Sequence, residues 1–252
     1  TLLQLDAKLN IGMSGGAVVN LKGEMVGMTT SLVSAAGFDA MAGYAIPMDV
    51  QGRRIVETLR KGKEYEYGFL GIRLDPNGTN KVDSAQPGTP ADEGNVLVGD
   101  QIVAVGDIAV NDADSLVLAI NSMPAGSKVP LKILRQDQLI ERTVELAKFR
   151  VEGEVIATNR PAPWRGLRID YTSTLPYTTF GEGMLGAMAR CGVVIAEVEP
   201  DSPAVAAGLK RGQVIRSVEG KTLKSPRDFT RVVAGLAGPV TIETDLGPVT
   251  IK

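Results

Sequence analysis

A serine among glycines near the start of the chain is the residue best suited to covalent chemistry. Ser14 lies in the sequence Gly-Met-Ser-Gly-Gly, which runs from Gly12 to Gly16. Because glycine permits backbone angles that other residues avoid, such a loop can direct the amides of Gly12 and Ser14 at one point, as an oxyanion hole requires. The same letters fit the Gly-x-Ser-x-Gly turn of α/β-hydrolases, but that turn needs a helix directly after the serine. Residues 17–19 are Ala-Val-Val, which indicates a strand, so the residues favour either an oxyanion-hole loop or a glycine-rich turn without chemistry.

The chain contains no histidine. A serine hydroxyl is a weak nucleophile unless an adjacent base accepts its proton, and imidazole is the commonest such base. We therefore expect this chain to be inactive as a hydrolase when it is alone, and we expect no His-ligated metal. Neither a metal-ligand spacing nor a phosphate-binding glycine loop is present in the sequence, so we expect no metal and no cofactor.

The composition narrows the class of protein. The 252 residues include 27 Lys+Arg and 29 Asp+Glu, which give a net charge of −2 and no electrostatic sign of nucleic-acid binding. The length predicts about two domains, with three small ones possible. No apolar run reaches the ~18 residues that cross a membrane. The one cysteine, Cys191, excludes an internal disulfide, and we expect it to be a buried small hydrophobe.

The elements around the serine can be predicted from local patterns. Residues 16–20 and 24–30 predict two strands joined by a glycine-containing turn. After them, Asp49 is a suitable N-cap for an amphipathic helix that Gly62 can end. A polar stretch follows this helix, and a second polar stretch with two prolines, residues 158–163, marks a further boundary.

The last part of the chain repeats the pattern of the block that follows that helix. Pro90 and Pro203 open similar helical turns 113 residues apart, and Gly99 and Gly212 precede similar strands at the same offset. Each copy has roughly 90 residues, too long for a solenoid unit. Strands dominate each copy, with two short helices, which predicts a small, partly open β-barrel.

An earlier glycine loop is also repeated. Gly-Phe-Leu-Gly-Ile at residues 68–72 matches Arg-Gly-Leu-Arg-Ile at residues 165–169, an alignment that pairs Gly71 with Arg168, 97 residues later. The shorter offset predicts 16 extra residues in the second copy, within about residues 170–191. Arg168 would then either disfavour the backbone angles that glycine allows or add a cation to the site.

These motifs resemble two PDZ domains of the type attached to HtrA/DegP-like serine proteases. The resemblance rests on the Gly-x-Leu-Gly-Ile loop, the Pro-Gly-x-Pro-Ala turn, the Gly-Asp-x-Ile-x-x-Val strand and the late helix. Residues 3–19 are similar to the active-serine region of that family, and residues 43–47 to the last strand of its protease domain. The resemblance implies a mainly β fold: the C-terminal part of a chymotrypsin-like β-barrel plus a connecting helix in residues 1–62, then two PDZ-like partly open β-barrels with short helices in residues 63–157 and 158–252.

The resemblance implies a serine endopeptidase that degrades misfolded proteins. Ser14 would be its nucleophile and the amide of Gly12 part of its oxyanion hole, with the His and the Asp supplied upstream of Thr1. Met13 departs from the usual Gly-Asn-Ser-Gly-Gly of the family, so a pseudo-protease or a non-catalytic PDZ tandem that binds peptides is the alternative. The resemblance also implies a periplasmic or cell-envelope location and a homotrimer or larger homo-oligomer.

The repeats suggest how peptides would bind. A nest of backbone amides can capture a C-terminal carboxylate while the peptide adds a strand to an exposed edge. The expected ligands are peptide C-termini and unfolded or misfolded polypeptides, and the first copy is favoured over the second as their binder. The expected groove residues are Phe69, Leu70, Gly71, Ile72, Leu116 and Ile120 in the first copy, and Leu167, Arg168, Ile169 and Phe229 in the second. The alternative for the helix positions is plain core packing.

Overall fold

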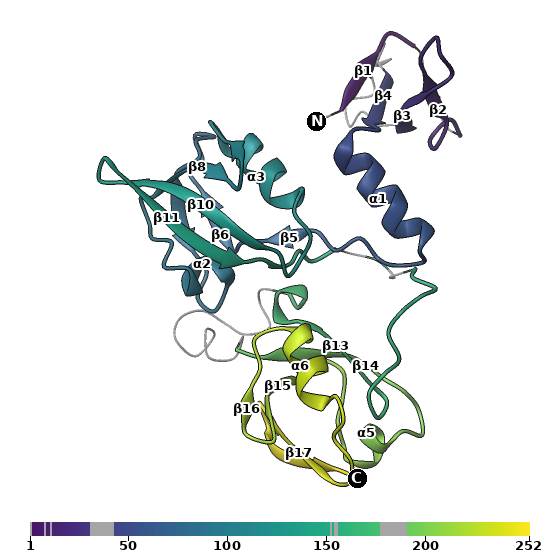
Figure 1. The fold of residues 1–252 in the computed structure, drawn as a ribbon, viewed down its shortest axis with the longest axis vertical. Coiled ribbons are helices and arrows are strands. Elements are labelled where there is room, and N and C mark those ends of the chain that lie inside the picture. Colours follow the sequence, from purple (N-terminus) through teal and green to yellow (C-terminus); the bar gives the residue numbers. More distant parts are fainter. Residues whose placement is uncertain are drawn as a thin grey trace. The chain divides into compact units, whose positions relative to one another are not determined.

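The computed structural model describes residues 2–7, 9–10, 12–30, 43–151, 153, 156–176 and 191–252 (Figure 1). The chain divides into two compact units, one made of Thr1–Tyr65 with Val155–Arg160 and the other of Glu66–Glu154 with Pro161–Lys252. Strands outnumber helices in both units, which confirms the mainly β fold. Most of the expected insertion of the second repeat lies outside the described residues, since residues 177–190 are not among them.

The first unit contains a four-stranded antiparallel sheet. Its strands are β1 (Leu3–Leu5), β2 (Ala17–Val19), β3 (Met25–Thr30) and β4 (Gly43–Pro47), in the order β1-β4-β3-β2. β2 and β3 form the hairpin that the sequence predicts, with Ala17 opposite Met28. Among the described residues the sheet stays open, so the expected part of a barrel is present as a sheet.

Helix α1 (Val50–Arg60) follows the last strand of this sheet. It begins where the sequence predicts, because Oδ1 of Asp49 accepts a hydrogen bond of 2.9 Å from the amide of Gly52. It ends before Gly62, whose φ of 69° lies in the left-handed region that glycine tolerates. Both signals act within a few residues of the helix, which explains why the sequence is sufficient to place it.

The first repeat is built from strands with two short helices. Its sheets have the orders β11-β10-β8-β9, β12-β5 and β6-β7. The elements are β5 (Gly68–Phe69), β6 (Ile72–Leu74), β7 (Val82–Ala85), α2 (Pro90–Glu93), β8 (Gln101–Val105), β9 (Ile108–Ala109), α3 (Ala113–Asn121), β10 (Lys128–Arg135), β11 (Gln138–Glu145) and β12 (Ala147–Lys148).

The second repeat has a corresponding order of elements. Its sheet runs β13-β14-β15-β17-β18, and β16 pairs with β15. The elements are β13 (Leu167–Tyr171), η1 (Thr172–Thr174), β14 (Val193–Val198), α5 (Pro203–Ala206), β15 (Val214–Val218), β16 (Lys221–Thr222), α6 (Pro226–Val233), β17 (Val240–Thr244) and β18 (Gly247–Ile251).

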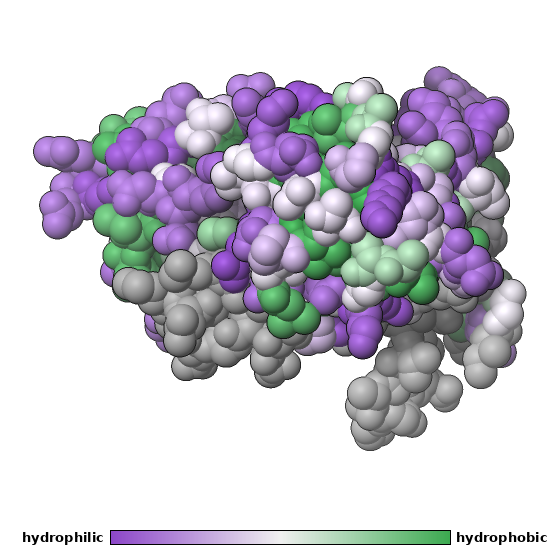
Figure 2. Space-filling view, turned by 90° about the horizontal axis from the view of Figure 1, so that it is seen from below, coloured by the Kyte–Doolittle hydropathy of each residue, from purple (hydrophilic) through white to green (hydrophobic). Residues whose placement is uncertain are grey.

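Each repeat has its own hydrophobic core. In the first, Ile102, Leu131 and Ile133 are completely buried, and in the second Ile195 and Ile242 are completely buried. On the face of the molecule that Figure 2 shows, hydrophobic residues lie in small groups between hydrophilic ones. In the described part of the chain, no helix is both long enough and apolar enough to cross a membrane.

The structure corrects the alignment of the two glycine loops. The carbonyl of Gly71 accepts from the amide of Gln86, whereas the carbonyl of Gly166 accepts from the amide of Glu199, 113 residues after Gln86. Gly166 therefore takes the place of Gly71, and Arg168 takes the place of Arg73. The expected pairing of Gly71 with Arg168 is wrong by two residues, because a match of Leu-Gly-Ile with Leu-Arg-Ile outweighed the glycine that the turn requires.

The prediction for the cysteine is also wrong. Cys191 is exposed, and it lies in a bend two residues before β14 begins at Val193. The residues that fill the core begin only with that strand, where Val193 and Ile195 are completely buried. The side chain of Cys191 therefore makes no part of the core, in spite of its apolar character.

Candidate functional site

The serine loop connects the first part of the sheet to β2. Ser14 is exposed at its tip, between Gly12 and Gly15, whose φ angles are 92° and 88°. These left-handed angles suit glycine and strain other residues. The amide of Gly15 donates to the carbonyl of Thr29 at 2.8 Å, and the amide of Met13 donates to that of Asn10 at 3.1 Å. The loop is therefore held by its own backbone and by β3.

Thr29 of β3 fixes the shape of this loop, and sequence reasoning did not single it out. Its Oγ1 accepts from the amide of Gly16 at 2.9 Å and donates to the carbonyl of Met13. Thr29 is buried, with 9% of its surface exposed, and a Cβ on Gly16 would lie 3.0 Å from its Oγ1. A threonine inside a strand is common, so no sequence signal distinguishes this one.

Met13 is the residue that departs from the usual family loop, and its side chain folds back onto the loop. Its Sδ accepts a hydrogen bond of 3.3 Å from the amide of Asn10, while 47% of its surface is exposed. A flexible thioether can bend in this way because it has three rotatable bonds and a weak acceptor. The side chain thus adds a contact within the loop.

The first glycine loop packs closely on the start of α2. A Cβ on Gly71, whose φ is 87°, would lie 2.3 Å from Cβ of Thr89, the N-cap residue of that helix. The amide of Ala91 donates to the carbonyl of Leu70 at 2.9 Å. This contact fixes the turn that leads from Phe69 into β6, so the position of the loop depends on the helix beneath it.

Strand β6 has one paired edge in the described part of the chain, where it contacts β7. Ile72 lies opposite Ala85, and the hydrogen bond from Gln86 to Gly71 flanks this pair. In an antiparallel ladder such a flanking bond marks a non-hydrogen-bonded pair, so the amide and carbonyl of Ile72 point away from β7. The strand therefore presents backbone groups on its outer edge, as β-strand addition requires.

Helix α3 lies next to the first core. Asp112 caps this helix, because its Oδ1 accepts a hydrogen bond of 2.7 Å from the amide of Ser115. Hydrogen bonds from Ser115 lower the pKa of the Asp112 carboxyl. Leu116 and Ile120 are 1% and 6% exposed and belong to the core cluster, against which Ile72 packs. The two side chains are therefore core residues of the first repeat.

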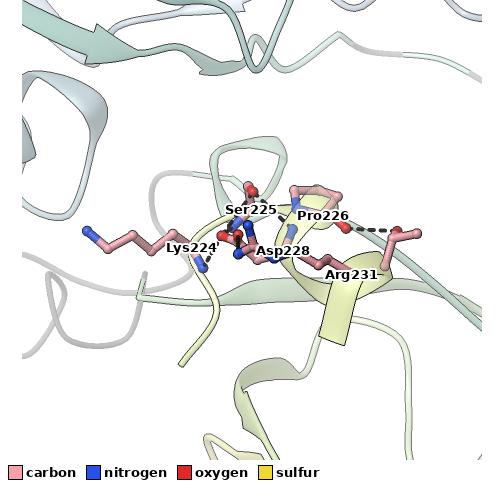
Figure 3. Close-up of polar contacts among 6 residues, drawn as sticks. Lys224, Ser225, Pro226, Asp228 and Arg231 are labelled. Atoms are coloured by element: carbon pink, nitrogen blue, oxygen red, sulfur yellow. Dashed lines mark hydrogen bonds and ion pairs between the residues drawn. The ribbon is translucent and has the colours of Figure 1, made fainter. Parts of the chain in front are cut away.

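In the second repeat, α6 corresponds to α3 and is capped in the same way. Ser225 Oγ accepts from the amide of Asp228 at 3.3 Å, and Oδ2 of Asp228 accepts from the amide of Ser225 at 3.1 Å (Figure 3). This reciprocal capping box satisfies two amides that the helix cannot bond internally. Phe229 lies on this helix and is 3% exposed, which makes it a core residue of the second repeat.

Arg168 lies on β13 and faces acidic residues of the neighbouring strand and turn. Its Nε lies 3.4 Å from Oε2 of Glu197, and its Nη2 lies 3.6 Å from Oε1 of Glu199. Its Nη1 donates to the carbonyl of Pro161. The guanidinium therefore already has two carboxylates near it. Its neighbours Leu167 and Ile169 belong to or pack against the second core.

Comparison with known families agrees with this geometry. Residues 68–146 and 194–244 each match a PDZ domain family. The chain is 29% identical over 249 residues to a probable periplasmic serine endoprotease DegP-like protein of Chlamydia trachomatis, a match that covers 94% of this chain and 48% of the relative. It is 27% identical over 246 residues to a protein of the same description in Brucella suis, covering 92% of this chain and 46% of the relative.

The chain spans about half the length of these curated relatives. Among solved structures, it is similar to the HtrA-type protease AlgW with a decapeptide, at a TM-score of 0.46 and 24% identity, covering 64% of this chain and 50% of that one. The chain thus carries two PDZ domains and is a homologue of the DegP/HtrA serine endoproteases.

Proposed function

We propose that the chain is the C-terminal part of a serine endopeptidase in which Ser14 is the nucleophile. The observation that carries the proposal is an exposed serine in a loop with left-handed angles at Gly12 and Gly15, held by β3. Such a loop suits a nucleophile whose oxyanion is stabilised by backbone amides, here those of Gly12 and Ser14. Homology to DegP-like serine endoproteases along the same chain supports this assignment.

A general base must come from another part of a longer polypeptide, because this chain has no histidine. In the proposed reaction the base takes the proton of Ser14 Oγ as that oxygen attacks the scissile carbonyl. The amides hold the negative oxygen of the tetrahedral intermediate, which collapses to an acyl-enzyme as the C–N bond breaks and the base gives its proton to the leaving amine. Water, deprotonated by the same base, then hydrolyses the acyl-enzyme and restores the Ser14 hydroxyl. We propose domain boundaries near residues 62 and 157, which keep α1 with the serine loop.

The first PDZ domain would bind the C-termini of polypeptide substrates. The outer edge of β6 offers backbone groups for strand addition, and Phe69, Leu70, Gly71 and Ile72 form the loop for the carboxylate. In this proposal Leu116 and Ile120 of α3 border the pocket for a hydrophobic terminal side chain. Unfolded or misfolded proteins in the periplasm or cell envelope are the proposed substrates, and the proposed assembly is a homotrimer or a larger homo-oligomer.

Labelling with a fluorophosphonate probe tests the protease proposal. The experiment uses the polypeptide together with the upstream segment that supplies the His and the Asp, since an unactivated serine does not react. We expect labelling that is lost in Ser14→Ala and kept in the control Ser127→Ala, because Ser127 lies in the first PDZ domain.

The same experiment separates the protease from the peptide-binding adaptor. If the folded, full-length protein binds peptides but Ser14 is not labelled, the protease proposal is wrong and the chain is part of a non-catalytic tandem. A Met13→Asn variant then tests whether Met13 is the reason that Ser14 is not labelled. Labelling that appears only in this variant would show that Met13 makes the natural protein a pseudo-protease.

A further inference from the structure

The backbone at the start of β13 is already paired with the chain just before it. The amide of Trp164 donates to the carbonyl of Leu167 at 3.0 Å, and the amide of Leu167 donates to the carbonyl of Trp164 at 2.9 Å. Arg165 and Gly166 between them have φ angles of 51° and 86°. Two left-handed residues in a two-residue loop are typical of a type I′ hairpin turn. The segment that ends at Trp164 therefore turns back beside the outer edge of β13.

This pairing uses the backbone groups that a ligand would need. Glu199 donates to Gly166 in the register described above, so the amide and carbonyl of Leu167 point away from β14, as those of Ile72 point away from β7. A peptide that adds to a PDZ groove pairs with this outer edge and places its carboxylate at the loop amides. Trp164 occupies both the amide and the carbonyl of Leu167. Arg168 donates to the carbonyl of Pro161, which lies three residues before Trp164.

The side chain of Trp164 lies against the helix that borders the groove. Its ring packs edge-on against Phe229 of α6, with the centroids 5.6 Å apart and an interplanar angle of 87°. The guanidinium of Arg165 lies 4.7 Å from the centre of the Trp164 ring. At this distance the positive charge is attracted to the face of the indole, which helps to hold the ring in place. Phe229 corresponds to Leu116 in the first repeat, 113 residues earlier. The indole thus lies where the terminal side chain of a ligand would contact the helix.

The corresponding residue of the first repeat is held elsewhere. Phe69 pairs with Ala147 of β12, and its ring lies 6.3 Å from that of Phe149. Within the described residues, β6 pairs with β7 alone, so the edge at Ile72 stays open. The two repeats share a fold, but Phe69 pairs with β12, whereas Trp164 at the corresponding position pairs with the start of β13.

We propose that residues 161–164 fill the groove of the second PDZ domain as an internal ligand, with Trp164 in the place of a peptide's last residue. The tandem then binds one peptide C-terminus per chain, at the first repeat. The statement about the first repeat rests on the proposed function, whereas the filled second groove does not.

The only tryptophan of the chain makes the proposal directly measurable. A fluorescein-labelled, alanine-rich decapeptide ending in Leu is titrated into the chain, and the same peptide with an amidated C-terminus is the control. We expect one bound peptide per chain and no change in Trp164 emission at saturation, because binding occurs away from the indole. Two bound peptides, or a shift of the Trp164 emission on binding, would overturn the proposal.

A pair of matched variants tests whether the Trp164 side chain is what blocks the second groove. In Trp164→Ala the internal ligand loses the ring that packs on Phe229, and we expect the number of bound peptides to rise from one to two. The control is Leu246→Ala, which removes an exposed side chain from the turn between β17 and β18, and we expect its single site to remain. An unchanged single site in a folded Trp164→Ala variant would show that the indole does not block the groove.

Hydrogen exchange of the unmodified chain gives a test that needs no variant. The amide of Leu167 is bonded to Trp164 and should exchange at least ~10-fold more slowly than the amide of Ile72. Equal, rapid exchange of the two amides would contradict the internal ligand. If instead no peptide binds while Leu167 remains protected, the proposed function of the first repeat fails and the filled second groove stands.

Discussion

At the scale of single residues, Gly71 and Gly166 are equivalent positions of the two repeats at which a side chain does not fit. A Cβ would lie 2.3 Å from Cβ of Thr89 in the first case and 2.1 Å from Cβ of Ser202 in the second. The two glycines also have φ angles of 87° and 86°, where other residues are strained. Two independent causes, backbone angle and close packing on a helix N-cap, therefore require glycine at each loop.

Alanine substitutions separate these two causes. Gly208 has a φ of 79°, but a Cβ added to it would have no neighbouring atom within 4 Å. Gly208→Ala should therefore lower the free energy of unfolding by about 1–2 kcal/mol, the cost of the left-handed backbone angle alone. Gly166→Ala adds the clash with Ser202, and we expect a further loss of about 1–3 kcal/mol. Urea unfolding followed by Trp164 fluorescence measures both. Equal losses in the two variants would show that the loop moves aside without cost.

At the scale of elements, a buried ion pair connects the turn before β8 to the end of β10. Asp100 accepts from Nε of Arg135 at 2.7 Å, from its Nη2 at 2.8 Å and from the amide of Leu97 at 2.8 Å. The Asp100 side chain is 1% exposed and that of Arg135 is 23% exposed. Burial alone would raise the pKa of Asp100, but these hydrogen bonds outweigh it and hold the pKa below its ordinary value.

The pair should make the first repeat sensitive to acid. Because the pKa of Asp100 is lower in the folded state than its ordinary 3.8, its stabilisation is complete above that pH and is lost as the pH falls through the lowered value. Asp100→Asn leaves Arg135 without its carboxylate and should cost about 3 kcal/mol at pH 7. The difference from the unmodified chain should shrink as the pH falls below about 4.

Urea unfolding followed by far-UV circular dichroism between pH 7 and pH 3 measures this effect. Asp137→Asn is the matched control, since Asp137 is exposed in the turn between β10 and β11 and should change stability by less than about 0.5 kcal/mol. A cost for Asp100→Asn that stays the same at every pH would mean that the carboxylate charge is not what stabilises the turn.

At the scale of the whole molecule, the two units differ greatly in the size of their cores. Among the described residues of the first unit, the buried hydrophobic side chains are Ala45 and Tyr65. Each repeat of the second unit instead buries a continuous cluster of aliphatic side chains from several strands and a helix. Since burial of apolar area is the main favourable contribution to folding, the second unit should be much the more stable.

Hydrogen exchange followed by mass spectrometry tests this difference. In this chain we expect amides of β3 and β4 to exchange at least ~100-fold faster than those of β8, β10 and β15, because local opening costs less where little apolar surface is buried. Adding the upstream protease segment of the proposed function should slow exchange in β3 and β4 and leave the repeats unchanged. Equal protection of both units in this chain would contradict the expectation from burial.

Local signals explain how much of this structure the sequence predicts. The β2–β3 hairpin and α1 could be predicted because a turn glycine and the Asp49 cap lie within or beside the elements themselves. The alignment of Gly71 with Arg168 failed because the true partner, Gly166, is defined by contact with Ser202, a residue far along the chain. Thr29 was missed for the same reason, since its role depends on a loop that precedes its strand.

The hairpin at Trp164 has a consequence for the side chains that the second repeat can carry. Because its own chain occupies this groove, the residues that line it need not fit a foreign peptide, whereas the residues that shape the turn must still hold the hairpin. Arg165 stands where the first copy has the buried Leu70, and it donates to carbonyls of Ile251 and Gly238 instead of filling a core. Gly166 and Ser202 keep the packing of Gly71 and Thr89. The ligand of the second repeat is thus encoded in the same chain, whereas the first repeat can bind peptides of different sequence.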